Sequence, residues 1–307
     1  MAVDSASSLS AGARPVAATP AWRKSPHPLR AAFVRTYRNP LGLMGLVILG
    51  LLVFAALFAP LISPYDPVVQ HQGRELLGPG GEFWLGTDEL GRDLLSRVIY
   101  GARPSLVVAV MVVVIGGGLG ILAGLSAGYF GGWVNSLLMR FFDAMFAFPP
   151  ILLGFVVIAA LGPGTTQVAY AIALAVVPTL GRVARSLVLR ERHRDYVLAA
   201  RSSGAGSVRV MFLHVLPNAV SPMIVNLALI MGFSVLAEAG LAFLGLGTQP
   251  PLPSWGAMLN SSRAYLRNDP WMAICPGVVL ALLLLGLNYL ADALREAFDP
   301  RRVNSGF

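Results

Sequence analysis

Six long apolar runs constrain this chain more than any other feature of its sequence. The first run, from Leu41 to Ile62, contains no charged residue. A helix needs about 20 mostly apolar residues to cross the hydrocarbon core of a bilayer, and each run is of that order. We therefore predict an all-α, polytopic membrane protein. Its six transmembrane helices are expected at Leu41–Ile62, Pro104–Gly128, Met139–Leu161, Gln167–Leu189, Ala219–Leu246 and Ala273–Leu294.

The composition excludes a soluble enzyme, because only 12% of the residues are charged against about 25% in soluble domains. A phosphate-binding loop needs a closing lysine, and Lys24 in the N-terminal tail is the only lysine. The four histidines are scattered, and no catalytic or metal-binding motif is present. We predict a non-catalytic chain that binds no cofactor or metal itself. Cys275, the one cysteine, excludes an intrachain disulfide and is expected to be a small buried apolar residue.

The distribution of basic residues predicts the topology. With the N-terminus in the cytoplasm, most of the 23 Lys and Arg residues fall on the cytoplasmic side, as positive-inside retention requires. This retention, and not a nucleic-acid partner, accounts for the net charge of +8. We predict that both termini are cytoplasmic.

This topology divides the chain into segments. Leu29, Phe33 and Tyr37 recur every four residues, which predicts a short helix on the inner membrane surface, in contact with lipid. An unstructured basic anchor is the alternative. The predicted segments are a cytoplasmic tail over 1–40, the first span over 41–62, an extracytoplasmic loop over 63–100, a transmembrane core over 101–294 with a cytoplasmic loop at 190–217, and a cytoplasmic tail over 295–307.

Three acidic residues in the loop after the first span, Asp88, Glu89 and Asp93, resemble calcium ligands at first sight. They lack the 12-residue calcium-loop pattern and its terminal glutamate. A helix N-cap at Thr87 or Asp88 is the prediction instead.

A glycine stripe runs along the second span, where Gly116, Gly120, Gly124 and Gly128 recur every four residues. Small residues at this spacing let another helix approach closely. We predict a helix-packing face, in preference to local flexibility.

Glu238 is the one acidic residue within the fifth apolar run. A charge at the bilayer centre costs about 2.5–3.5 kcal/mol on insertion scales. Glu238 is expected near the outer end of its helix, where it would line a path or gate, or would lie at the interface or pair with a neighbouring helix. A proton relay would need several such groups, so a proton-coupled carrier is disfavoured.

The stretch from Asp195 to Asn218 is polar and basic and lies between two apolar runs. Its pattern predicts a short helix, a break at Gly204 and Gly206, and a second short helix, because glycine in a helix interior costs about 1 kcal/mol relative to alanine. Pro217 then marks the entry to the next span. The stretch is either a lever worked by another protein or an ordinary loop with a glycine turn.

The same stretch resembles the "EAA" loop of the membrane subunits of bacterial ABC importers. Leu198 stands where that family has Glu, and His214 where Ile is usual. The residues in register are Ala199, Ala200, Gly204, Leu216 and Pro217. The stretches LGTDELGRDLLSRVIYGARPSL, MRFFDAMFAFP and LAEAGLAFLGLGTQPPLPSWG are similar to the C-type membrane subunit of dipeptide, oligopeptide and nickel importers. The likeness covers about Arg35 to Arg295.

This resemblance implies a type I ABC importer permease in the bacterial inner membrane that moves dipeptides or oligopeptides. It implies a homologous permease, two ATPase subunits that hold ATP and Mg²⁺, and an extracytoplasmic binding protein as partners. The helix around Tyr196 would sit in an ATPase groove, with Ala199 and Ala200 allowing close approach, Gly204 making the turn and Pro217 fixing the exit. Arg201 would pair with an acidic groove or be solvated.

Three alternatives remain open at this point. A nickel or metal-chelate importer has the same architecture. A secondary carrier often shows inverted repeats, and none is clear here. An intramembrane enzyme would need paired catalytic side chains within the spans, and none is visible.

Overall fold

The computed structural model describes residues 28–298, and every regular element in that range is helical. The predicted tails at 1–27 and 299–307 lie outside the described residues. The elements are α1 (Pro28–Arg38), α2 (Pro40–Leu57), α3 (Ala59–Ile62), α4 (Leu94–Met111), the π-helix η1 (Val112–Gly117), α5 (Gly118–Phe130), α6 (Gly132–Phe146), α7 (Pro150–Leu161), α8 (Thr165–Glu191), α9 (Asp195–Ser202), α10 (Ser207–Val210), the π-helix η2 (Met211–Val215), α11 (Leu216–Phe243), α12 (Trp255–Ser262) and α13 (Trp271–Ala297).

Five helices in the described range are long and apolar enough to cross a membrane, and a bent pair makes up to six. The five are Pro40–Leu57, Leu94–Phe130, Thr165–Glu191, Ser207–Phe243 and Trp271–Ala297. The fourth and sixth predicted spans lie wholly inside α8 and α13. An all-α membrane protein is thus confirmed.

The second span starts earlier than the predicted Pro104, because α4 begins at Leu94 and Pro104 lies inside it. The physical reason is a strong N-cap: Asp93 Oδ2 accepts hydrogen bonds from the backbone N–H of Ser96 (2.7 Å) and from its hydroxyl (2.6 Å). The prediction of an N-cap at Thr87 or Asp88 is therefore wrong.

The third predicted span is broken into two helices. The pair α6 and α7 is bent by 89°, and α6 starts at Gly132, before the predicted Met139. Pro149 and Pro150 lie at the bend. Both lack backbone N–H groups and disfavour a helical conformation in the residue before them, so two in succession favour a break here.

Two further boundaries differ from the prediction by more than one helical turn. The first span ends at Leu57 and a separate turn, α3, follows, with Pro60 in its first turn. The fifth span does not start at Ala219, because α10, η2 and α11 run continuously from Ser207. Pro217 lies in the first turn of α11, directly after the wide turn of η2, where its missing N–H is tolerated.

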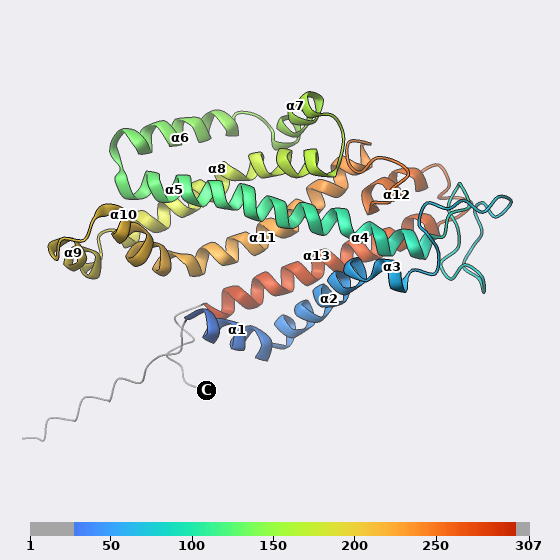
Figure 1. The fold of residues 1–307 in the computed structure, drawn as a ribbon, viewed down its shortest axis with the longest axis horizontal. Coiled ribbons are helices and arrows are strands. Elements are labelled where there is room, and N and C mark those ends of the chain that lie inside the picture. The colour runs from blue at the N-terminus through green and yellow to red at the C-terminus, as the bar shows by residue number, and fades with distance from the viewer. Residues whose placement is uncertain (1–27, 299–307) are drawn as a thin grey trace, which may run out of the picture.

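The helices pack as a bundle in which α11 lies between two groups (Figure 1). On one side α5 and α8 run side by side and carry α6 and α7, and on the other α13 packs against α2. Helix α1, the end of α13 and helix α9 lie at one end of the bundle. The two ends of the described range therefore lie at the same end of the bundle as the 190–217 loop. Which side of the membrane they face stays a prediction.

The helix predicted from Leu29 to Tyr37 is α1. Phe33 and Tyr37 are exposed on it, as contact with lipid would require, whereas Arg35 Nη1 donates to the Ala297 carbonyl of α13 (3.2 Å). Contact of α1 with the membrane surface stays a prediction.

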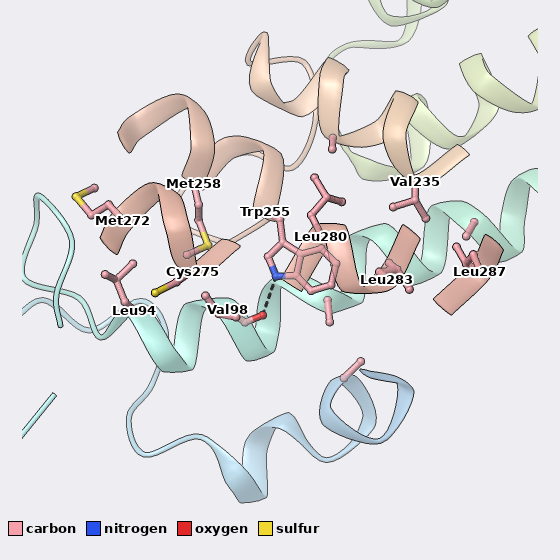
Figure 2. Packing of buried hydrophobic residues seen from close by; sticks show 14 residues of the cluster. Leu94, Val98, Val235, Trp255, Met258, Met272, Cys275, Leu280, Leu283 and Leu287 are labelled. Atoms are coloured by element: carbon pink, nitrogen blue, oxygen red, sulfur yellow. Dashed lines mark hydrogen bonds between the residues drawn. The ribbon is translucent and has the colours of Figure 1, made fainter. Parts of the chain in front are cut away.

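The opposite end of the bundle has a core centred on Trp255 (Figure 2). The indole is fully buried, and its Nε1–H donates to the Val98 carbonyl of α4 (2.9 Å). Cys275 is buried in the same cluster, as predicted for a small apolar residue. This core ties α12 and α13 to the start of α4.

Candidate functional site

Helix α9 is the short helix predicted in the polar stretch, and glycine ends it. Gly204 has φ of +82°, a conformation that favours glycine. The backbone N–H of Ala205 donates to the Ala200 carbonyl (3.1 Å), and that of Gly204 to the Arg201 carbonyl (2.9 Å). This pair of bonds is the Schellman motif. Gly206 has φ of −64° and needs no such freedom.

Helix α9 is anchored on the ends of α5 and α8 by an apolar cluster. Val197 is fully buried in it. Leu125, Tyr129, Val188, Val210, Met211 and Val215 form the rest of the cluster, and Ala200, Ala205 and Leu216 pack against it. Of the two alanines predicted to face a partner, Ala200 therefore turns toward the chain's own core, and Ala199 is exposed.

The outer face of α9 presents Leu198, 49% exposed, beside Ala199 and Arg201. The guanidinium of Arg201 lies over the Tyr129 ring of α5, 5.0 Å from its centroid. Arg201 thus has an aromatic partner within the chain. The two predictions for Arg201, a pair with an acidic groove and a solvated side chain, did not include this contact. Pro217 is also exposed, at the start of α11.

Tyr196 fixes the other side of α9. Its hydroxyl donates to Glu191 Oε2 at the end of α8 (2.9 Å). Partial desolvation of this 38% exposed residue, and then the hydrogen bond to Glu191, raise the pKa of Tyr196 to about 12. The phenol therefore remains a donor at any physiological pH. Sequence reasoning missed Glu191, whose signal was a lone acidic residue within an arginine-rich stretch.

The glycine stripe packs against α8 in regular register. A Cβ at Gly116, Gly120 or Gly124 would meet the carbonyl of Ala173, Val177 or Gly181 respectively. A Cβ at Gly128 would meet the carbonyl of Arg185 (2.9 Å). The two helices therefore touch backbone to backbone over three repeats, as predicted for a packing face, and α5 and α8 form one rigid pair.

Glu238 is 1% exposed and lies between α11 and α4. Its Oε2 accepts a hydrogen bond from the Ser105 hydroxyl (2.7 Å), and its Oε1 has no partner. This is the predicted pairing with a neighbouring helix. The side chain does not lie on an open surface of the described chain, so a gate at Glu238 is not favoured by its position.

In the 63–93 loop, Asp88 binds two arginines. Asp88 Oδ2 lies 2.6 Å from Arg92 Nε and 3.2 Å from Arg97 Nε, and all three side chains are buried. Arg97 Nη1 also donates to the Pro67 carbonyl (2.8 Å) and the Pro251 carbonyl (3.3 Å). Within residues 28–298, no group of three or more His, Cys, Asp or Glu residues is placed to hold a metal ion.

Two adjoining cavities of about 230 and 350 Å³ lie beside the α6–α7 bend. Pro150, Ala175 and Phe233 line both, and no charged residue lines either. A charged peptide terminus would find no partner there within this chain.

Fold and site together define a class: a multi-span membrane component with a short, anchored helix in a polar loop and no visible catalytic cluster in the described range. The model of "Binding-protein-dependent transport system inner membrane component" matches residues 120–304. That of "N-terminal TM domain of oligopeptide transport permease C" matches residues 27–79. The chain belongs to this family of transport permeases and is a multi-pass inner membrane protein.

The chain is also similar over most of its length to curated permeases. It is 45% identical over 286 residues to a di/tripeptide transport system permease protein of Pseudomonas aeruginosa, covering 91% of this chain and 94% of the relative. It is 41% identical over 274 residues to a dipeptide transport system permease protein of Alkalihalophilus pseudofirmus, covering 89% and 90%. A glutathione transport system permease protein of Pectobacterium atrosepticum is 41% identical over 258 residues, covering 84% and 85%.

Proposed function

We propose that this chain is the permease subunit of an ABC importer of short peptides, worked by ATPase subunits that dock on α9. The observation that carries the proposal is the construction of α9: one face is fixed to α5 and α8 through Val197, and the other presents Leu198 and Ala199. The curated relatives are named for dipeptide, di/tripeptide and glutathione transport, which supports peptides as the substrate class.

The mechanism follows from rigidity. A displacement of α9 passes to α5 and α8 because the buried cluster joins all three. The glycine register keeps α5 and α8 together, so they move as one body, and such rigid-body motion is a common route between two transporter states. The chain itself is non-catalytic: ATP and Mg²⁺ are held by the ATPase subunits. A homologous permease and an extracytoplasmic binding protein complete the assembly.

The test is a crosslink within the assembled complex. In a Cys275→Ala background, Ala199→Cys is expected to crosslink to an ATPase subunit. Trp84→Cys is the matched control, because Trp84 is 69% exposed in the loop at the opposite end of the bundle. A crosslink from Trp84→Cys and none from Ala199→Cys would contradict docking on α9.

Uptake separates the substrate classes. Vesicles that contain the complete complex are expected to accumulate labelled dipeptide when ATP is inside. Excess nickel should not compete, since the curated relatives are named for peptide and glutathione transport. Uptake of nickel without uptake of dipeptide would show that the metal-chelate alternative is correct.

A further inference from the structure

Glu191 occupies a position that helix energetics disfavour. It is the last residue of α8, where the negative end of the helix dipole repels a carboxylate. The residue is also buried, with 7% exposed, and a buried charge is unfavourable unless it is paired and hydrogen-bonded. Local rules of this kind are broken mainly at functional sites. The question is therefore what this carboxylate holds.

The partners of Glu191 lie on both sides of the turn between α8 and α9. Oε2 accepts the hydrogen bond from Tyr196 of α9 and lies 3.8 Å from Arg194 Nε. Oε1 lies 3.6 Å from Arg190 Nε in α8 itself. Only Arg192, His193 and Arg194 separate the two helices. The Glu191–Tyr196 hydrogen bond therefore bridges the turn directly.

A second contact between α9 and α8 is apolar, between Val197 and the cluster that contains Val188. Apolar contact is not directional, so it would let α9 pivot on α8. A hydrogen bond weakens steeply when it is misaligned, so it opposes pivoting. Arg192 strengthens the turn from the other side, since its Nη1 donates to the Gly128 carbonyl of α5 (2.9 Å).

We propose that Glu191 is the positioning residue of the ATPase-docking helix. Its carboxylate sets the angle between α8 and α9, so that a push on α9 moves α8 instead of being absorbed in the turn. Within 195–218 the only acidic residue is Asp195, and Leu198 has no carboxylate to offer. The inference rests on the proposed docking of ATPase subunits on α9.

The experiment uses the complete complex in vesicles and compares three variants with a control. Glu191→Ala removes the acceptor, Glu191→Gln keeps an acceptor oxygen without the charge, and Tyr196→Phe removes only the donor hydroxyl. Arg190→Gln is the control, because it removes the ion pair of Glu191 with an exposed arginine and leaves the Tyr196 bond. Three quantities are measured: the Ala199→Cys crosslink, peptide taken up per ATP hydrolysed, and the mobility of a spin label at Ser202→Cys.

Glu191→Ala and Tyr196→Phe are expected to keep the crosslink, to increase the label's mobility, and to lower uptake per ATP by about tenfold, since a hydrogen bond to a charged group contributes about that factor. Glu191→Gln should recover part of the loss, and the control should match wild type. A chain that carries both Glu191→Ala and Tyr196→Phe should be no worse than Glu191→Ala alone, because both changes remove the same hydrogen bond. Wild-type coupling in Tyr196→Phe would overturn the inference, even if Glu191→Ala fails to assemble. If the chain with native Glu191 gave no Ala199→Cys crosslink, the docking proposal would be refuted. In that case the spin label still tests Glu191 separately, because unchanged label mobility in Glu191→Ala and Tyr196→Phe would refute its role.

Discussion

Replacing Gly120 with alanine tests the contact between α5 and α8. The added Cβ would lie 2.7 Å from the Val177 carbonyl oxygen and 3.0 Å from Leu180 Cβ. Because ordinary contact begins at 3.4 Å, the two helices would have to separate by roughly 0.7 Å, and a gap of that size forfeits about a quarter to a half of the dispersion attraction.

The expected net effect is a loss of stability. Overpacking of this kind costs about 1–3 kcal/mol, and the better helix propensity of alanine returns up to about 1 kcal/mol. We expect Gly120→Ala to lower the free energy of unfolding by about 1–2 kcal/mol, which corresponds to a Tm lower by several degrees. Gly124→Ala should cost more, because its Cβ would lie closer still to the Gly181 carbonyl.

Gly118→Ala is the matched control on the same helix, since a Cβ there has no neighbouring atom within 4 Å. It should be neutral or slightly stabilising. Thermal unfolding of the purified chain in one detergent, followed by circular dichroism, measures all three variants. Equal Tm values for Gly118→Ala and Gly120→Ala would refute close backbone packing of α5 on α8.

Three other substitutions test features described above. Gly204→Ala should speed hydrogen exchange of the α9 amides about fivefold relative to Gly206→Ala, because an L residue at φ of +82° costs about 1 kcal/mol. Equal exchange rates in the two variants would count against a turn that requires glycine at position 204. Ser105→Ala should lower the free energy of unfolding by about 1–3 kcal/mol, since it leaves the buried Glu238 carboxylate without its partner. Glu238→Gln should be close to neutral. A larger Tm loss in Glu238→Gln than in Ser105→Ala would contradict this pairing. Asp88→Asn should lower the free energy of unfolding by about 3–5 kcal/mol, because it leaves Arg92 and Arg97 buried without their shared carboxylate. Glu82→Gln, in the exposed pair with Arg74, should lower it by less than about 1 kcal/mol. Similar Tm losses in the two variants would argue against a buried ion pair of Asp88 with Arg92 and Arg97.

The sequence predicted the helical membrane fold because apolar length is a strong and local signal. It placed the ends of helices less well, since it located the ends of apolar runs. Helix α4 continues beyond its apolar run because Asp93 caps it, and the fifth span extends back to Ser207 through a π-turn. Neither cause depends on hydropathy.

The candidate site was predictable only where its features depend on local sequence. Gly204 could be placed because a glycine between two helical patterns signals a turn. The inward direction of Ala200 and the Tyr129–Arg201 contact depend on how α9 lies against α5, and no local pattern carries that information. Glu191 was missed because its role comes from Tyr196, five residues on.

The contacts of Trp255 and Arg97 bear on biosynthesis. The indole reaches Val98 across 157 residues, and Arg97 reaches Pro251 across 154. A ribosome makes the 63–93 loop and the start of α4 long before it makes their partners. The packing at that end of the bundle is therefore incomplete until most of the polypeptide has entered the membrane. A chain that ended before residue 250 would lack the Trp255–Val98 and Pro251–Arg97 contacts.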